Sequence, residues 1–375
     1  MYFSTQTVLT ILLILVVALV AYAIGHSVGA LRTRRSIDSQ SSSELAKVTS
    51  ERESSGTSSD KQPRFAVVYN PTKPEAQEII AAAQTEARNS RWAQPLIIPS
   101  DEEDGGVAAA RRAVDEGVDL IIAAGGDGTV RAVAHVIADT DVALGLVPIG
   151  TGNLLARNTG LFFENPEWSI KIAMYGHDRH IDVIRTRTSP QAEPDTSVVM
   201  TGMGYDAAVM ETVSPELKER IGWLAYVEAG SRQLTGNRTK VKMKFDDKPV
   251  QSYSIRSVLG ANAGRVQAGL ELLPGSRPDD GLINVLVTTP KNIAQWASVL
   301  LAVVGRRKRG LATEIVTCSS VTIEAEEELA LQLDGDFAGM SDYFEMRVVH
   351  AALTLRTPTP NQRRQMRSAQ WNLPG

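Results

Sequence analysis

The feature that most constrains the fold is an alternation of short apolar runs with helix-like patterns, which begins at Phe65. The apolar runs read FAVVY, PLIIP, DLIIAA and ALGLVP, and the segments between them have helical spacing at 74–88, at 107–116 and from about residue 129. Such alternation is typical of parallel βαβ units in a layered α/β domain, whose ligands bind beyond the carboxyl ends of the strands. The loops that follow the apolar runs are therefore the first candidates for a functional site.

Three of these loops have the residues of a nucleotide cleft: YNPTKP at 69–74, GGDGT at 125–129 and PIGTGN at 148–153. Glycines allow backbone N–H groups to approach an anion closely, and the N-terminus of a following helix adds positive potential. Asp127 is an acid in the tightest of these turns, so it requires a metal ion or a chemical role, unless it only caps a plain turn. Thr151 adds a neutral donor of the kind that a polyphosphate needs. We expect the three loops to converge on one edge of the sheet.

After residue 182 the pattern changes to alternating segments separated by turns, as in TKVKMKFDDKPVQSYSIRSVLGAN. Period-two alternation predicts antiparallel β-structure, and two helix-like stretches, at 221–234 and 293–304, interrupt it. The folded part is thus predicted to comprise an α/β nucleotide-binding domain over 64–182 and an antiparallel β domain over 183–356. The tail over 357–375 has no periodicity and is expected to be flexible.

The N-terminal part differs from the rest because residues 7–24 contain no charge over about the length that crosses a bilayer. No Lys or Arg precedes this run, and Arg32, Arg34 and Arg35 follow it, which favours a single-pass transmembrane anchor at 1–30 over a cleaved signal peptide. Residues 31–63 are rich in Ser, Glu and Lys and predict a disordered linker. The sequence therefore predicts a cell-membrane protein with a cytoplasmic catalytic domain.

Composition and motifs exclude several other classes of protein. A formal net charge of −4 and 5% aromatic residues supply neither the basic field nor the stacking platforms of a nucleic-acid-binding protein. The single cysteine, Cys318, excludes an intramolecular disulfide and a zinc cluster of several thiolates. No Walker-type phosphate loop is present in the sequence. GMGYDA at 202–207 meets a relaxed dinucleotide pattern but lies outside a predicted βαβ unit, so a tight turn explains it better.

Five motifs, AGGDGTV, VPIGTGNLLARN, GMGYDAAV, NAGRVQAGLELLPGSRPDDGLINV and LQLDGD, occur in the order and spacing of the diacylglycerol kinase catalytic domain family. The chain resembles this family, which includes bacterial soluble lipid kinases and sphingosine kinases, from residue 65 to about residue 356. The resemblance implies an α/β nucleotide-binding domain similar to that of NAD kinase and ATP-dependent phosphofructokinases, followed by an antiparallel β-sandwich domain for the lipid substrate. It also implies ATP and Mg²⁺ as cofactors and a lipid hydroxyl as the phosphate acceptor.

The resemblance also assigns roles to individual residues. Asp336, the last acid of LQLDGD, would be the general base, and Asp127 would contribute to catalysis through nucleotide and Mg²⁺ binding. Asp280 in RPDDG matches an aspartate that holds a structural Mg²⁺ in some members, with Asp279 beside it. The residues that would line the ATP site are Asn70, Lys73, Gly125, Gly126, Asp127, Gly128, Thr129, Gly150, Thr151 and Asn153.

Three positions depart from the family pattern: Ala132 stands where members often have Glu, Asp336 replaces the commoner Glu, and Asn284 stands where Asp is frequent. The first two leave open a catalytically weakened nucleotide-binding membrane regulator, and the third puts the second Mg²⁺ site in question. The predicted function is ATP-dependent phosphorylation of diacylglycerol to phosphatidate. Another acceptor, such as a sphingoid base, a different lipid or NAD, is the alternative. The expected partner is a membrane lipid, and a homodimer is compatible with the sequence.

Overall fold

The computed structural model describes residues 62–371 of the 375-residue chain, apart from 162–164, 205–237, 267–270, 292–294, 296–308 and 311. The apolar run at 7–24 and the helix-like stretch at 221–234 lie outside the described residues. So do the predicted linker, except for its last two residues, and the stretch at 293–304, except for Gln295.

The membrane span predicted from the sequence has no counterpart in the part of the chain that the structure describes. Its longest helix, α2 (Ala76–Arg88), has 13 residues, whereas a bilayer span needs about 20. No described helix is both long and apolar enough to cross a membrane. The expected localisation as a single-pass cell-membrane protein is therefore corrected, and a transmembrane helix is not part of the observed fold.

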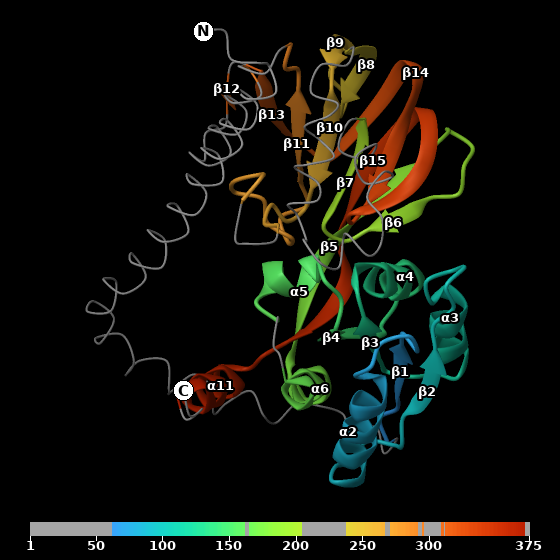
Figure 1. Cartoon of the computed structure of the whole chain (residues 1–375), viewed down its shortest axis with the longest axis vertical. Helices are drawn as coiled ribbons and strands as arrows, with labels where there is room; N and C mark the ends of the chain where they lie inside the picture. Colours follow the sequence, from blue (N-terminus) through green and yellow to red (C-terminus); the bar gives the residue numbers. More distant parts are fainter. Residues whose placement is uncertain are drawn as a thin grey trace, which may run out of the picture. The chain divides into compact units, whose positions relative to one another are not determined.

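The first half of the described chain folds into the predicted parallel α/β layers (Figure 1). Its strands pair in parallel in the order β2-β1-β3-β4, with Phe65 of β1 opposite Leu120 of β3. Strand β1 is buried on both faces: Phe65 and Val67 pack with residues of α2 and α6, whereas Ala66 and Val68 pack with residues of α3 and α4. The elements are β1 (Phe65–Tyr69), α2, β2 (Leu96–Pro99), α3 (Val107–Asp115), β3 (Leu120–Gly125), α4 (Asp127–Ile137), β4 (Ala143–Pro148), α5 (Leu154–Thr159) and α6 (Pro166–Tyr175).

The second half is antiparallel, as its period-two pattern predicts. In β8, Val241, Met243 and Phe245 are buried in one core, while Lys242 and Lys244 between them are exposed. The described strands are β5 (His177–Arg187), β6 (Asp195–Ser197), β7 (Met200–Gly204), β8 (Thr239–Phe245), β9 (Gln251–Ile255), β10 (Ser257–Ala261), β11 (Ile283–Thr288), β12 (Arg309–Gly310), β13 (Thr313–Cys318), β14 (Ser320–Leu333) and β15 (Asp336–Thr357). The GMGYDA glycines end β7, which pairs antiparallel with β10 and β14 rather than in a βαβ unit.

Strand β15 belongs to both halves. It pairs antiparallel with β14 and with β5, and near its end Leu355 pairs in parallel with Leu144 of β4. A single hydrogen-bonded sheet of 15 strands therefore passes from the parallel half into the antiparallel half. Residues that the sequence analysis places at the end of the β domain thus complete the sheet of the nucleotide-binding domain.

The tail contains a helix, α11 (Pro360–Trp371), where the sequence analysis expects a flexible segment. Proline has a fixed φ that suits the first position of a helix. Thr359 N–H donates to Gln362 Oε1 at 2.8 Å, and Gln362 N–H donates to Thr359 Oγ1 at 3.2 Å, which caps the helix start. Gln362 Nε2 also donates to the Lys171 carbonyl of α6 at 3.2 Å. Local capping and the contact with α6 therefore support this helix.

Candidate active site

The three predicted loops leave the same edge of the parallel sheet and are hydrogen-bonded at their bases. The Asn70 N–H donates to the Ala124 carbonyl at 3.0 Å, and the Ile149 N–H donates to the Gly125 carbonyl at 3.2 Å. These bonds join the ends of β1 and β4 to the end of β3, which lies between them. The loops converge as the parallel order of the strands predicts.

Two glycines of these loops are required by the close approach of neighbouring groups. A Cβ at Gly150 would overlap the Cα of Gly126 in the adjacent loop, and a Cβ at Gly125 would overlap the side chain of Thr129. Thr129 is buried in this position. The loops at 125–129 and 148–153 therefore lie backbone against backbone, which larger residues at these positions would prevent.

Asp127 joins the second loop to the end of the third, and Asn153 closes the third loop on itself. Asp127 Oδ1 accepts the N–H of Leu154, the first residue of α5, at 2.6 Å. Asn153 is buried with a φ of 48°, and its Oδ1 accepts the Gly150 N–H at 3.0 Å while its amide donates to the Gly150 carbonyl. The acid that stands out in the glycine turn is therefore part of the framework of the site.

The ionisation of Asp127 is set by its surroundings. Burial is the largest cause that raises the pKa of Asp127 from 3.8 to about 7, and the negative charges of Asp334 and Asp336 raise it further. The hydrogen bond from Leu154 acts in the opposite direction. A carboxyl group with this pKa exchanges its proton near neutral pH, and a nearby cation would favour its charged form.

Asp336 reaches the nucleotide loops from the antiparallel half. It is the first residue of β15 and follows a hairpin turn of Asp334 and Gly335, both with positive φ (50° and 91°). Positive φ at both turn residues is typical of a type I′ hairpin, which the Asp-Gly pair favours. A Cβ at Gly128 would lie 3.4 Å from Asp336 Oδ2, so this carboxylate lies beside the first turn of α4. The positive end of the helix dipole favours an acid there.

Asp334 is the residue that the sequence analysis missed. Its side chain is buried, and burial raises its pKa whereas the hydrogen bonds that it accepts lower it. The four donors lie between β6 and β7: Ser197 Oγ (2.7 Å), Val198 N–H (2.9 Å), Val199 N–H (2.8 Å) and Met200 N–H (3.0 Å). Asp334 therefore fixes the hairpin from which Asp336 projects. The Asp-Gly sequence does indicate a turn whose aspartate side chain accepts hydrogen bonds. The donors could not be found from the sequence, because they lie 134–137 residues away.

Ala132, a departure from the family pattern, is buried on α4. A Cβ at Gly105, in the loop between β2 and α3, would lie 3.7 Å from the Ala132 Cβ and 3.6 Å from the Gly128 carbonyl oxygen. This loop therefore packs directly against α4 at the position where relatives often have glutamate. The small alanine side chain is compatible with this close packing.

The other predicted ATP-site residues lie on the same loops. Asn70 Oδ1 accepts from the N–H (2.9 Å) and the hydroxyl (2.7 Å) of Thr72, so its side chain shapes the first loop. Lys73 is half-buried, and its N–H donates to the Asn70 carbonyl at 3.3 Å. Thr151 is exposed at the third loop.

Asp279 and Asp280 lie in the loop before β11, and each side chain contacts at least one neighbouring protein group. Asp279 Oδ2 accepts from Arg179 Nη2 at 2.7 Å, and its Oδ1 lies 3.4 Å from Arg277 Nε. The bond to Arg179 lowers the pKa of Asp279. Asp280 Oδ1 accepts the Leu282 N–H at 3.1 Å. Among the described residues, no three His, Cys, Asp or Glu side chains gather as a metal site. Asp279 does not fit a structural Mg²⁺, because Arg179 and Arg277 already balance the charge of its carboxylate. For Asp280, the acid that matches the family's Mg²⁺ ligand, that role stays a prediction.

The Asn284 side chain is also hydrogen-bonded to neighbouring residues. Its amide donates to Ser276 Oγ at 2.9 Å, and its Oδ1 accepts from Thr317 Oγ1 at 2.6 Å. These two bonds use the side chain at the position where relatives often have aspartate. The loop before β11 is therefore held by hydrogen bonds.

Asp182 of β5 also binds this loop. It is fully buried, and its carboxylate accepts the N–H groups of Gly281 at 2.7 Å and Ala351 at 2.8 Å. His350 Nδ1 lies 2.8 Å from Asp182 Oδ1. Asp182 thus connects the loop before β11 to the part of β15 where the pairing with β5 is irregular.

Comparisons with known proteins agree with this layout. One family model, described as the diacylglycerol kinase catalytic domain, matches residues 64–186, and another, described as the YegS C-terminal NAD kinase beta sandwich-like domain, matches residues 197–357. A diacylglycerol kinase of Bacillus subtilis (strain 168) is 30% identical over 236 residues, which are 62% of this chain and 76% of the relative. A YegS-like lipid kinase of Chromohalobacter salexigens is 26% identical over 68% of this chain and 82% of the relative.

A solved structure shows the same fold. The crystal structure of a diacylglycerol kinase from Bacillus anthracis str. Sterne covers 80% of this chain and 97% of its own, with a TM-score of 0.57 and 17% identity. The two matched domains and the identity to the Bacillus subtilis protein establish the family. The chain belongs to the diacylglycerol kinase catalytic domain family and is a lipid kinase, a phosphotransferase that acts on an alcohol group.

Proposed function

We propose that this kinase transfers the γ-phosphate of ATP to the hydroxyl group of diacylglycerol and so produces phosphatidate. The observation that carries the proposal is the position of Asp336 Oδ2 beside Gly128, at the first turn of α4 and next to the nucleotide loops. A substrate hydroxyl placed beside the γ-phosphate at the N-terminus of α4 would lie within reach of the Asp336 carboxylate. Diacylglycerol is supported by the names of relatives, among them the Bacillus subtilis protein.

The phosphates of ATP would lie on the surface formed by the three loops. Backbone N–H groups at the start of α4 and in the glycine turns donate hydrogen bonds to phosphate oxygens in such sites. The half-buried Lys73 lies in the first loop and would balance negative charge on the phosphates. Asp127 and Asn153 would keep the loops in register through their bonds to Leu154 and Gly150.

Asp127 is the residue that would hold Mg²⁺. Carboxylate oxygens are the ligands that this cation prefers. The fit is supported by the pKa of Asp127, which neighbouring carboxylates help to raise to about 7 and which a cation would lower. When bound, Mg²⁺ would neutralise charge on the transferring phosphate.

Asp336 would act as the general base. Its carboxylate would accept the proton of the acceptor hydroxyl as the hydroxyl oxygen attacks the γ-phosphorus and the bond from that phosphorus to the oxygen bridging the β- and γ-phosphates breaks. The proton would end on Asp336, and the bridging oxygen would leave as part of ADP. Asp334 would position this base, because four hydrogen bonds fix the hairpin that carries it. Aspartate is one methylene shorter than the glutamate of relatives, and the contact with Gly128 brings it close to the helix end.

A transfer assay tests the proposal. Purified protein would be incubated with Mg²⁺ and ATP labelled at the γ-phosphate, with diacylglycerol, a sphingoid base and another lipid alcohol in mixed micelles, and with NAD in solution. We expect label in phosphatidate, loss of transfer in Asp336→Asn with ATP binding retained, and normal transfer in Asp342→Asn. Asp342 is an exposed acid on the same strand and serves as the matched control.

The other outcomes decide between the alternatives. Transfer to a sphingoid base or to NAD, without transfer to diacylglycerol, would replace the proposed acceptor. ATP binding without transfer to any acceptor would favour a weakened nucleotide-binding regulator. Unchanged activity in Asp336→Asn would refute Asp336 as the base.

A further inference from the structure

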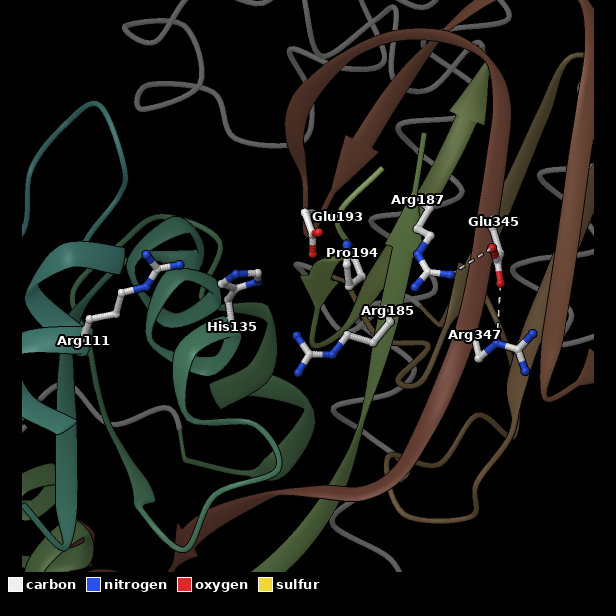
Figure 2. Close-up of a pocket in the computed structure, with 8 residues that line it drawn as sticks. All are labelled: Arg111, His135, Arg185, Arg187, Glu193, Pro194, Glu345 and Arg347. Atoms are coloured by element: carbon white, nitrogen blue, oxygen red, sulfur yellow. Dashed lines mark hydrogen bonds and ion pairs between the residues drawn. The ribbon is translucent and has the colours of Figure 1, made fainter. Parts of the chain in front are cut away.

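A cavity lies between helices α3 and α4 and strands β5 and β15, away from the nucleotide loops. Its volume is about 560 Å³. Figure 2 shows Arg111 of α3 and His135 of α4 on one side, facing Arg185 and Arg187 of β5, with Arg347 of β15 further along. His135 lies about 12 Å along the α4 axis from Asp127, so the cavity is at the opposite end of this helix from the catalytic residues.

The lining of this cavity has an excess of positive charge. It contains four arginines and two glutamates. Glu345 lies 3.9 Å from Arg187 and 3.4 Å from Arg347, so one carboxylate is shared between two guanidinium groups. Arg185 is held by Asp139 at 3.3 Å and by the hydroxyl of Thr196. These contacts therefore position Arg185, Arg187 and Arg347. They do not provide a separate carboxylate for each arginine, because Arg187 and Arg347 share Glu345.

Two further observations indicate that the cavity favours an anion. Among the described residues, no atom hydrogen-bonds to the buried Nε of Arg187. His135 contacts Thr196 Oγ1 at 3.2 Å, and its pKa is lowered, first by burial and then by the positive charges of Arg185, Arg111 and Arg131, against Asp195, which raises it. The positive charges of these arginines therefore reach the His135 ring, where they oppose the effect of Asp195 on its pKa.

We propose that this cavity, here called the arginine cavity, binds a phosphate group through Arg111, Arg185 and Arg347. Guanidinium groups present planar forks that match phosphate oxygens, and two or three of them around one cavity are the usual recognition of such an anion. The volume is within the range of small-molecule sites. Free phosphorylated compounds and the headgroups of anionic phospholipids share this chemistry, and the experiment distinguishes them.

Binding at the arginine cavity would join the two halves of the molecule. Arg111 and His135 belong to the α/β half, whereas Arg185 and Arg347 belong to strands of the antiparallel half. The same two elements, α4 and β15, carry Asp127 and Asp336. A bound phosphate would therefore stabilise the relative position of the two elements that form the active site. This inference does not depend on the acceptor of the kinase.

The test compares single-site variants of the full chain. Arg111→Ala and Arg347→Ala remove exposed arginines of the cavity, and Arg112→Ala removes the neighbouring exposed arginine of α3, which does not line it. Inorganic pyrophosphate is the soluble probe, measured by calorimetry. Vesicles of phosphatidylglycerol, compared with phosphatidylcholine vesicles, are the lipid probe, measured by co-sedimentation.

We expect pyrophosphate or phosphatidylglycerol to bind about tenfold more weakly to Arg111→Ala and to Arg347→Ala than to the unchanged protein, with Arg112→Ala unaffected. The probe that shows this pattern identifies the source of the phosphate. An independent measurement uses the His135 ring resonance in the unchanged protein, whose pKa should rise when pyrophosphate binds because the anion favours the protonated ring. The proposal is overturned if neither probe binds, if all three variants bind alike, or if the His135 titration does not move.

Discussion

Two groups of acids from the motifs of this kinase have opposite electrostatic surroundings. Around the glycine turn, Asp127 lies near Asp334 and Asp336, and its pKa is raised to about 7. In the loop before β11, Asp279 lies 2.7 Å from Arg179, and its pKa is lowered. The negative charges around Asp127 help to raise its pKa, so this group of acids favours a cation. Asp279 is already paired with the guanidinium group of Arg179. Acids in a motif therefore do not identify a metal site until the charges of their neighbours are known.

The largest effect is expected on kcat when the proposed base, Asp336, is replaced. Asp336→Asn should lower kcat by about a hundredfold to ten-thousandfold, because an amide cannot accept the proton of the acceptor hydroxyl. Steady-state transfer to the acceptor found in the screen measures this, with ATP affinity as the second readout. A loss of the same size in Asp342→Asn would show that the effect is not specific to the base.

Asp334→Ala should lower the free energy of unfolding by about 3 kcal/mol, because buried backbone N–H groups between β6 and β7 lose their acceptor. Urea denaturation of the purified variant measures this loss. Asp334→Asn keeps one acceptor oxygen and should lose less. If the alanine variant unfolds at the same urea concentration as the unchanged protein, the hairpin is not held by this side chain.

Asp127 should make stability depend on pH. Its pKa is raised in the folded protein from 3.8 to about 7, so the folded state binds more protons than the unfolded state between these values, and stability falls as the pH rises through this window. Asp127→Asn should remove that loss, so its melting temperature should fall less than that of the unchanged protein between about pH 5 and about pH 8. Parallel melting curves would contradict the raised pKa.

The smallest effects are expected at the arginine-bound acid. Arg179→Ala should cost about 1 kcal/mol of stability or less, because both partners are partly exposed. Asp279→Asn should leave the Mg²⁺ concentration for half-maximal activity unchanged, since this carboxylate does not fit a metal. Activity titrated with Mg²⁺ checks this, and a higher Mg²⁺ requirement in Asp279→Asn would remove the contrast between the two loops.

The parts of the fold that were predicted from the sequence depend on short-range patterns. Alternating apolar runs and helices indicated the parallel layers, and the alternation in β8 indicated which of its side chains are buried. The parallel order then placed the three glycine loops on one edge, because the carboxyl ends of parallel strands meet there. The helix in the tail was missed, since its capping by Thr359 and Gln362 is stabilised by a contact with Lys171 of α6.

By itself, then, the sequence determined the α/β and antiparallel halves, the glycine loops and the Asp-Gly turn before Asp336, because each arises from residues close together in the chain. Only the tertiary structure decided which partners the charged side chains have. Asp334 meets the turn after β6, Asp279 meets Arg179, and the arginine cavity draws on α3, α4, β5 and β15. These partners are separated by about a hundred residues or more, and the local pattern of a sequence contains no information on which distant strands will pair.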